Sequence, residues 1–321
     1  MAEVDLLDFL RDCKRLAIQA LGTNAGKPAE GGLARWKHLV IHGYRLEDDH
    51  SYRETENRLR CFSELREILE LDLNDVPDFS TIYKSFDRFN MTIWRALLRV
   101  SAEQLPQSGH VALDSTFFER GHASSYYLRR SDRDVQTLKV TTLTDTESLA
   151  VVDLQCSVEW KHDTKLGPQV VRRNADDLLS VAADKGFHDW MSKFEFYTFD
   201  IDPLVLERGS SPATVGDNAL IRETGYSQRW MSETSYSTTK RSLGSAVRAQ
   251  FWYREFREIV LMFAISNIEQ FWRNYDHGAV PQFNRADRSA SQQLERDLRW
   301  RRDLRRCAGR AHRQNRARDR Q

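Results

Sequence analysis

The order of short apolar runs between residues 108 and 249 is the feature that most restricts the fold of this chain. Five runs have the length and composition of strands, at residues 110–116, 138–144, 150–157, 179–186 and 194–200. No helical pattern separates the first three, so we expect these strands to be antiparallel. Helical patterns alternate with the later runs, so we expect the last strands to be parallel. The sequence therefore predicts an α/β protein with a mixed sheet.

Helical patterns flank this region on both sides. Apolar residues recur at helical spacing through the first hundred residues, with helices expected at about 51–71 and 80–100. Further long helices are expected from residue 226 and over about 251–272, whereas 202–225 is expected to be irregular. The whole order resembles that of the ribonuclease H-like fold, with an N-terminal helical domain before the core and helices after it.

The composition excludes several classes of protein. Hydrophobic residues make up 40% of the 321 residues, which is enough to bury a large core and excludes global disorder. The longest dense apolar stretch, 259–265, is far shorter than the roughly 20 residues of a membrane span, so no membrane partner is expected. The acidic first residues differ from a secretory signal, which favours a cytoplasmic location. The segment 22–28 departs from a phosphate loop, so no nucleotide cofactor is expected.

Charge is distributed unevenly along the chain. Residues 111–220 hold 12 lysines and arginines against 18 acids, whereas residues 221–321 hold 21 against 11. An acidic middle beside a basic end suits a cation site that meets a polyanion, although a solvated surface with a basic tail gives the same counts. We expect a helical domain at 1–105, an α/β domain at 106–275 and a basic, disordered tail at 276–321.

Two aspartates follow apolar runs that are expected to be strands. Asp114 and Asp184 would lie where strands end, and ligands of open α/β sheets bind at such ends. Carboxylates hold Mg²⁺, and two such ions can clamp the attacking and leaving oxygens of a phosphoryl transfer. Other acids of the same region compete for this assignment: Glu119, Asp132, Asp134, Asp153 and Asp163.

A second group of polar residues lies on the helix expected from residue 226. At 100° per residue, Tyr226, Arg229, Glu233 and Lys240 occupy one stripe about 60° wide. Glu233 can complete a carboxylate set, while Arg229 and Lys240 can bind phosphates. The alternative is an exposed stripe in which Arg229 and Glu233 form an ordinary i, i+4 ion pair.

The spacing Tyr-x2-Arg-x3-Glu-x6-Lys of this stripe resembles the signature of the DDE transposases of bacterial and archaeal insertion sequences. The segments 112–116 and 183–187 are similar to the family's first- and second-aspartate segments. The stretches 160–174 and 240–257 look like the versions in haloarchaeal insertion sequences. The resemblance covers about residues 50–275.

The resemblance implies a role for each member of the two groups. Two Mg²⁺ or Mn²⁺ ions would be held by Asp114, Asp184 and Glu233, whose carboxyls would converge. The terminal phosphates of the transposon end would be bound by Tyr226, Arg229 and Lys240. Metal-activated water would cleave the DNA, and the freed 3′-hydroxyl would attack target DNA without a covalent protein intermediate. A homodimer on DNA is expected, because both transposon ends must be held together.

Two other functions fit the same residues. A decayed or captured copy could act as a non-catalytic DNA-binding protein through its N-terminal helices. A ribonuclease H-like nuclease could hydrolyse DNA without strand transfer. Intact acids argue against decay, whereas the choice between nuclease and transposase rests on the family resemblance alone.

The arginine-rich end of the chain generates a first prediction. Residues 301–321 hold nine arginines and two acids, with few apolar residues to pack. Truncation after about residue 277 should leave the fold and cleavage in place. For each phosphate that the shortened chain no longer binds, the salt slope of DNA binding should fall by about 0.9, alike on all sequences. Salt titrations of full-length and truncated protein on specific and random DNA would measure this, and a loss of specific binding alone would contradict it.

Overall fold

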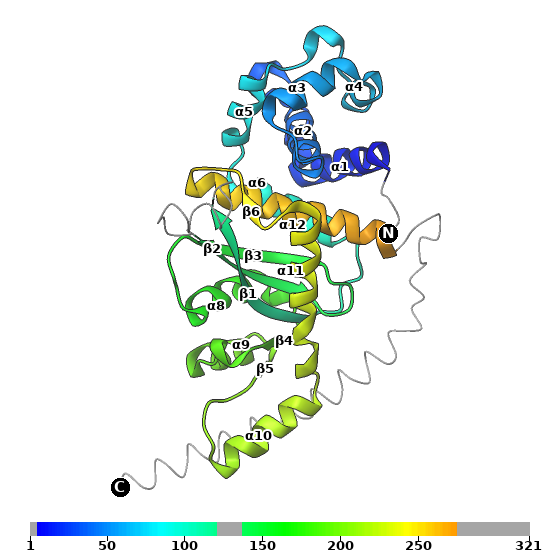
Figure 1. The fold of residues 1–321 in the computed structure, drawn as a ribbon. Helices are drawn as coiled ribbons and strands as arrows, with labels where there is room; N and C mark the ends of the chain where they lie inside the picture. Colours follow the sequence, from blue (N-terminus) through cyan, green and yellow to red (C-terminus); the bar gives the residue numbers. More distant parts are fainter. Residues whose placement is uncertain (1–4, 121–136, 275–321) are drawn as a thin grey trace, which may run out of the picture. The chain divides into compact units, whose positions relative to one another are not determined.

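The computed structural model describes residues 5–120 and 137–274. The described elements belong to one compact unit that ends at Asn274 (Figure 1). The expected tail at 276–321 and the competing acids Asp132 and Asp134 lie outside the described residues. None of the described helices combines the length and the apolar content that a membrane crossing requires.

Six α-helices precede the sheet within residues 5–105. Their bounds are α1 Leu6–Leu21, α2 Arg35–Glu47, α3 Tyr52–Cys61, α4 Ser63–Leu69, α5 Phe79–Arg88 and α6 Met91–Ala102. The helical character expected for this part is confirmed, but its boundaries differ. Phe62 is extended (φ −103°, ψ 113°), which divides the helix expected at 51–71 into α3 and α4. The helix expected at 80–100 is also divided, because Asn90 is extended and its side chain caps α6.

One mixed sheet follows these helices. Its strands are β1 His110–Arg120, β2 Thr137–Asp145, β3 Val151–Ser157, β4 Ser180–Ala183, β5 Asp202–Val205 and β6 Ala246–Val247. Their order is β3-β2-β1-β4-β5, with β6 paired to β1. β1, β2 and β3 are antiparallel neighbours, whereas β4 is parallel to β1 and β5 is parallel to β4. The predicted mixed α/β sheet is therefore confirmed, and its first three strands are antiparallel as expected.

The prediction for residues 194–225 is wrong. The run 194–200 has the aromatic content of a strand, but most of it lies in α9 (Trp190–Thr198), whose first turn is capped by the Asp189 carboxylate. The fifth strand is β5, inside the region that is expected to be irregular. β5 contains Pro203, which lacks an N–H and is tolerated because β5 ends the strand order of the sheet.

The remaining helices are α8 Asp163–Arg173, α10 Pro212–Glu223, α11 Trp230–Leu243 and α12 Trp252–Asn274. Three of them, α8, α11 and α12, follow the predicted order with shifted bounds, whereas α10 lies in the region that is expected to be irregular. Helices cover both faces of the sheet, so its core is closed on each side (Figure 1). α8 and α9 pack against the face that carries Val111 and Leu113. α11 and α12 pack against the face that carries Phe118 and Val140, in a cluster that continues into the N-terminal helices.

Asn267 fixes α12 against both the sheet and α6. Its side chain accepts from the Val151 N–H (2.8 Å) and donates to the Val151 carbonyl (3.0 Å). The same amide nitrogen lies 3.0 Å from the hydroxyl of Ser101 in α6. A buried amide that is satisfied on both sides holds its elements in one register.

Gly167 allows α8 to approach β1 closely. A Cβ atom at this position would lie 2.8 Å from the Phe187 ring and 2.9 Å from a methyl group of Leu113. Both neighbours are buried, so neither can move aside freely. The closeness of α8 to β1 beside Asp114 therefore depends on the missing side chain.

We predict that Gly167→Ala lowers the free energy of unfolding by about 1 kcal/mol. Overpacking a core costs about 1–3 kcal/mol, and the better helix propensity of alanine returns at most about 1 kcal/mol. Urea unfolding would measure the difference. Gly216→Ala in α10 is the matched control, because no atom lies within 4 Å of its added Cβ, and it should stabilise by about 0.5–1 kcal/mol. A Gly167 variant as stable as the control would contradict the packing argument.

Candidate active site

β1 and β4 bring two of the expected site residues to one level of the sheet. The last pair of their parallel register is Leu113 opposite Ala183. Asp114 and Asp184 are the next residues on the two strands, so one further step of the register sets them side by side. Side chains alternate along a strand, and Leu113 and Ala183 both face the α8 side. Asp114 and Asp184 therefore share the opposite face, on which α11 lies.

The position of Asp114 within its strand differs from the expected one. Asp184 directly follows β4, as predicted, but Asp114 is the fifth residue of β1, which continues to Arg120. What ends at Asp114 is the pairing of β1 with β4. The paired stretch of β1 and β4 stops at Leu113, so Asp114 lies where β1 loses β4 as its neighbour, much as a residue does at the end of a strand.

The helix that carries the second group of expected residues begins differently from the prediction. Tyr226–Arg229 form a 3₁₀ turn, and α11 begins at Trp230. Gly225 precedes the turn with a φ of 108°, a conformation that favours glycine. Because a 3₁₀ helix has three residues per turn, the angles expected for an α-helix do not hold at Tyr226.

α11 is fastened to β1 directly at Asp114. The buried hydroxyl of Tyr236 lies 2.6 Å from the Asp114 carbonyl oxygen and 2.8 Å from the Thr142 hydroxyl. The hydroxyl of Ser232 lies 3.4 Å from the Asp114 carboxylate. Burial raises the pKa of Tyr236 well above its usual value, so the phenol keeps the proton that it donates. These contacts place Glu233, which lies next to Ser232, beside β1 at the level of Asp114.

The residues that fasten α11 were not among those expected from the sequence. Ser232, Ser235 and Thr239 recur at helical spacing and are buried, with Tyr236 between them. A stripe of small hydroxyl residues at positions i, i+3 and i+7 is the signal that could have revealed the packed face of the helix.

Arg229 lies between the expected acids. One of its terminal nitrogens is 3.1 Å from the Glu233 carboxylate and 3.8 Å from that of Asp114. Asp184 also acts on the guanidinium, since it is among the groups that raise the pKa of Arg229. Desolvation is the largest influence on that pKa and acts in the opposite direction. The i, i+4 pair of Arg229 and Glu233 thus exists, but it forms part of a larger acidic group.

The carboxylate of Asp114 lies in an unfavourable position for a negative charge. Burial raises the pKa of Asp114, and the Glu233 and Asp163 carboxylates raise it further. The Ser115 N–H, which donates to Asp114 at 2.8 Å, and the Arg229 charge act in the opposite direction. A cation is the ligand that such a carboxylate favours, and Arg229 is the cation that lies beside it.

The other two expected phosphate ligands have different surroundings. Tyr226 packs partly against the buried cluster around Ala182 and Leu204. Burial and the charge of Asp184 raise the pKa of Tyr226. The ammonium group of Lys240 lies 2.8 Å from the Thr116 hydroxyl and 2.8 Å from the Phe117 carbonyl oxygen. Burial lowers the pKa of Lys240. Lys240 therefore ties α11 to β1 in this structure.

Asp163 is the competing acid that lies nearest to the group. Its carboxylate accepts from Ser115 at 2.6 Å and pairs with Lys139 at 2.9 Å. Ser115 alternates with Asp114 along β1, so Asp163 approaches from the α8 side of the strand. Of the other described competitors, Asp153 pairs with Arg173 at 2.7 Å between β3 and α8.

Asp114, Asp184 and Glu233 carry the oxygen ligands that a divalent ion prefers. In this structure, however, Asp114 and Glu233 lie beside the guanidinium of Arg229. Carboxylate oxygens are the ligands of Mg²⁺. Among residues 5–120 and 137–274, no three His, Cys, Asp or Glu side chains gather closely enough to hold a metal ion. The acids of the site flank Arg229 instead, so binding a metal would require them to turn away from it.

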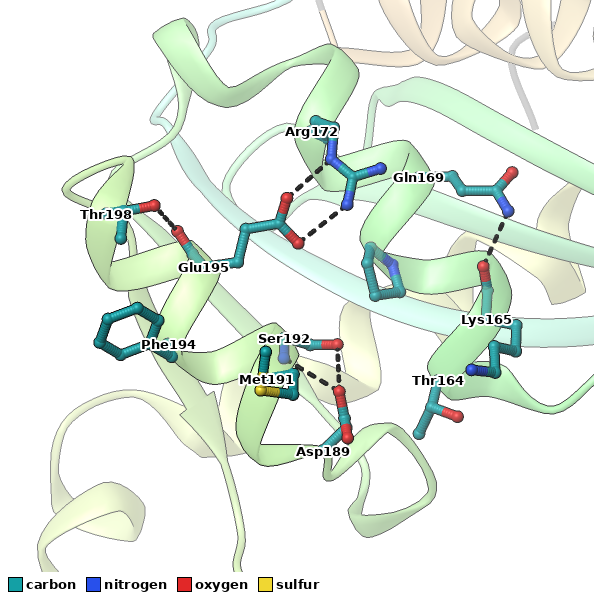
Figure 2. A pocket seen from close by; sticks show the side chains of 11 residues that line it. Thr164, Lys165, Gln169, Arg172, Asp189, Met191, Ser192, Phe194, Glu195 and Thr198 are labelled. Atoms are coloured by element: carbon teal, nitrogen blue, oxygen red, sulfur yellow. Dashed lines mark hydrogen bonds and ion pairs between the residues drawn. The ribbon is translucent and has the colours of Figure 1, made fainter.

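A groove of about 500 Å³ between α8 and α9 lies outside this acidic group. Figure 2 shows Arg172 and Glu195 facing each other there, with two bonds of 2.7 and 2.9 Å. Asp189 accepts from the N–H and the hydroxyl of Ser192 (Figure 2). Arg172, Glu195 and Asp189 are thus paired within the groove, so the acidic group around Arg229 remains the better candidate for chemistry.

The raised pKa of Asp114 predicts a pH-dependent stability. Ionising this buried carboxyl opposes folding, so the wild-type protein loses the corresponding stability as pH rises from the unfolded pKa of about 3.9 through the raised folded pKa. Asp114→Asn does not ionise. The free energy of unfolding of Asp114→Asn minus that of wild type should therefore increase with pH. Chemical unfolding of both proteins between pH 4 and 8, in the presence of a chelator, would measure this difference.

Asp189→Asn is a control with the opposite sign. The hydrogen bonds from Ser192 lower the pKa of Asp189, so ionisation of Asp189 favours folding, and that stability is present above the unfolded pKa. The relative stability of Asp189→Asn should therefore fall as pH rises to about 5, around the unfolded pKa, and stay level above it. Equal slopes for the two variants would contradict the assignment of an unfavourable charge to Asp114.

Comparison with known proteins identifies the family of the chain. The family profile described as transposase DDE domain matches residues 105–268, slightly more than half of the sequence. This match covers the whole described sheet, the acidic group and most of α12. No curated protein matches the sequence. The acids that meet on one face of a mixed sheet thus lie inside the matched region, and the chain belongs to the DDE transposase domain family.

Proposed function

We propose that this protein is an insertion-sequence transposase that cleaves DNA at transposon ends and joins the freed 3′ end to target DNA. The observation that supports this proposal is the position of Arg229 between Asp114 and Glu233, with Asp184 one residue beyond the pairing of β4 with β1. The order of the strands supports a ribonuclease H-like core. The matched spacing from Tyr226 to Lys240 supports the insertion-sequence class that carries this signature.

In this proposal the three acids bind the divalent ions that the family uses. Mg²⁺ or Mn²⁺, bound as a pair, would stabilise the charge that develops on the attacking and leaving oxygens of phosphoryl transfer. Asp114 and Asp184 supply rigid ligands from neighbouring strands. Glu233 has an exposed side chain (58%), so it can move from Arg229 toward a metal without disturbing the core.

The cations of the site bind DNA in the same proposal. Arg229 is released from the acids when they bind metal, and its fork then suits a phosphate of the transposon end. Tyr226 lies one 3₁₀ turn before Arg229 and can donate its hydroxyl to the same strand. The ammonium group of Lys240 can bind a phosphate once its hydrogen bonds to Thr116 and Phe117 are broken.

The remaining parts of the proposal concern the domains and the assembly. Residues 1–105 would bind the transposon end through their helices, and 106–275 would carry out catalysis. Residues 276–321 would add non-specific attraction to DNA through their arginines. A homodimer would hold both ends, because joining requires the two ends at one target.

The decisive substitution is Glu233→Gln. It keeps the shape of the side chain and removes the charge that a metal needs. We expect Mg²⁺-dependent cleavage of end DNA to fall by more than the roughly 10- to 100-fold caused by removal of an outer-shell partner. Binding to the same DNA, measured by fluorescence anisotropy, should remain nearly unchanged. Cleavage near the wild-type rate would overturn the catalytic assignment.

Three further variants sharpen this test. Glu195→Gln removes a carboxylate that also pairs with an arginine, outside the acidic group, and it should cleave at the wild-type rate. Asp163→Asn tests the competing acid. If Asp163→Asn abolishes cleavage whereas Asp184→Asn does not, Asp163 replaces Asp184 in the catalytic set. Cleavage without joined products in a strand-transfer assay would indicate a nuclease instead.

A further inference from the structure

A buried arginine lies far from the acidic group, in the N-terminal helices. Arg45 of α2 is 2% exposed, and its Nε has no hydrogen-bond partner. One terminal nitrogen makes a single long contact of 3.5 Å to the His50 carbonyl oxygen. Its guanidinium packs over the Tyr52 ring at 4.7 Å. A buried cation without a closely paired anion is strongly unfavourable, which indicates that an anion is needed here.

Arg45 lines a cavity that is large enough to admit such an anion. The cavity has a volume of about 220 Å³ and lies between α2, α3, α5 and the segment that leads into α12. A water molecule occupies about 30 Å³, and pockets for drug-sized ligands exceed about 300 Å³. The cavity therefore suits a small charged group, such as a phosphate and part of its sugar, better than a whole cofactor.

Two further arginines reach the same cavity, and each is already bound to protein groups. Arg248 donates to the His50 carbonyl oxygen at 3.0 Å and pairs with Asp49, whose side chain is 80% exposed. Arg254 forms a two-point pair with Asp87 at 2.8 and 3.0 Å. Water screens the exposed Asp49, so Arg248 keeps much of its attraction for a second anion.

Glu258 is the carboxylate in the wall of this cavity, and it does not replace the missing anion. Its two carboxylate oxygens accept hydrogen bonds from the backbone N–H groups of Arg248 (2.7 Å) and Ala249 (3.1 Å). No ion pair joins Glu258 to Arg45 among the described contacts. Cationic charge thus predominates in the wall, with Tyr52 and Tyr83 as aromatic neighbours.

We propose that this cavity is a phosphate-binding site, with Arg45 and Arg248 as its cationic ligands, and that a DNA strand supplies the phosphate. The guanidinium fork matches phosphate oxygens, and the rings of Tyr52 and Tyr83, over which Arg45 and Arg254 pack, line the same cavity. The phosphate site itself does not depend on catalysis. The choice of DNA as its source rests on the proposed function.

The site would link two parts of the chain when DNA binds. Arg45 and Tyr52 belong to the N-terminal helices, whereas Arg248 precedes α12. A phosphate between Arg45 and Arg248 adds a shared ligand to both parts and removes the repulsion between the two cations. DNA held there is contacted at a second place, separate from the acidic group.

The test compares full-length wild type with Arg45→Met, in a chloride buffer free of phosphate and with a chelator. Inorganic phosphate should raise the Tm of wild type but leave that of Arg45→Met unchanged. The affinity of Arg45→Met for DNA should fall by roughly 10- to 100-fold, as expected when a charged hydrogen bond to a ligand is removed. The salt slope of DNA binding should fall by about 0.9.

Arg53→Met is the matched control. Arg53 is an exposed arginine of α3 that also packs over an aromatic ring, at 4.2 Å from the Phe79 centroid, and its variant should respond to phosphate like wild type. Arg248→Met provides a second test at a less buried position, in case Arg45→Met fails to fold, and it should also lose the response to phosphate.

Three results would overturn the proposal. Equal phosphate responses of wild type and both cavity variants would show that the cavity binds no phosphate. An absent response in wild type, with unchanged DNA affinity in the variants, would assign Arg45 a purely structural role. A phosphate response that is abolished in the variants while DNA affinity is unchanged would replace DNA by a free phosphate compound. Because no cleavage is measured, failure of the catalytic proposal leaves each result interpretable.

Discussion

The hydrogen bond from Tyr236 to the Asp114 carbonyl oxygen is the contact on which the geometry of the site depends. It joins a helix to a strand at the point where the strand loses its neighbour β4, so the helix cannot slide along the sheet without breaking a buried bond. Glu233, three residues earlier, is carried to Asp114 by this contact. Residues separated by 119 positions thus meet because one phenol is fixed.

In the absence of other cations, the positive charge of Arg229 stabilises the negative charges of the neighbouring acids. Acids gathered at one edge repel each other, and the guanidinium between Asp114 and Glu233 offsets this repulsion. The same residue is therefore both counter-ion and competitor for whatever cation the acids bind. In the proposed reaction, exchange of partners at Arg229 would couple the binding of metal to the binding of DNA.

Much of the architecture could be predicted from sequence, and the failures have physical causes. The strands with β-branched runs were recognisable, as was α12, because its apolar stretch 259–265 lies in a long helical pattern. α2 was not, because ten of its residues are buried and no single apolar face repeats. β5 has four residues and a proline, too little for a periodic signal. The spacing of residues in the sequence predicts Arg229 and Glu233 as site residues. The contact of Tyr236 with Asp114 became visible only in the structure.

The proline of β5 has a consequence for the whole chain during synthesis and assembly. An outer strand with free N–H groups is a template on which other chains can add, and long exposed strands promote aggregation in this way. β5 is short, and Pro203 removes one of the donors that such growth requires. This edge of the sheet therefore offers a poor template for another strand, so copies of the protein are discouraged from joining edge to edge.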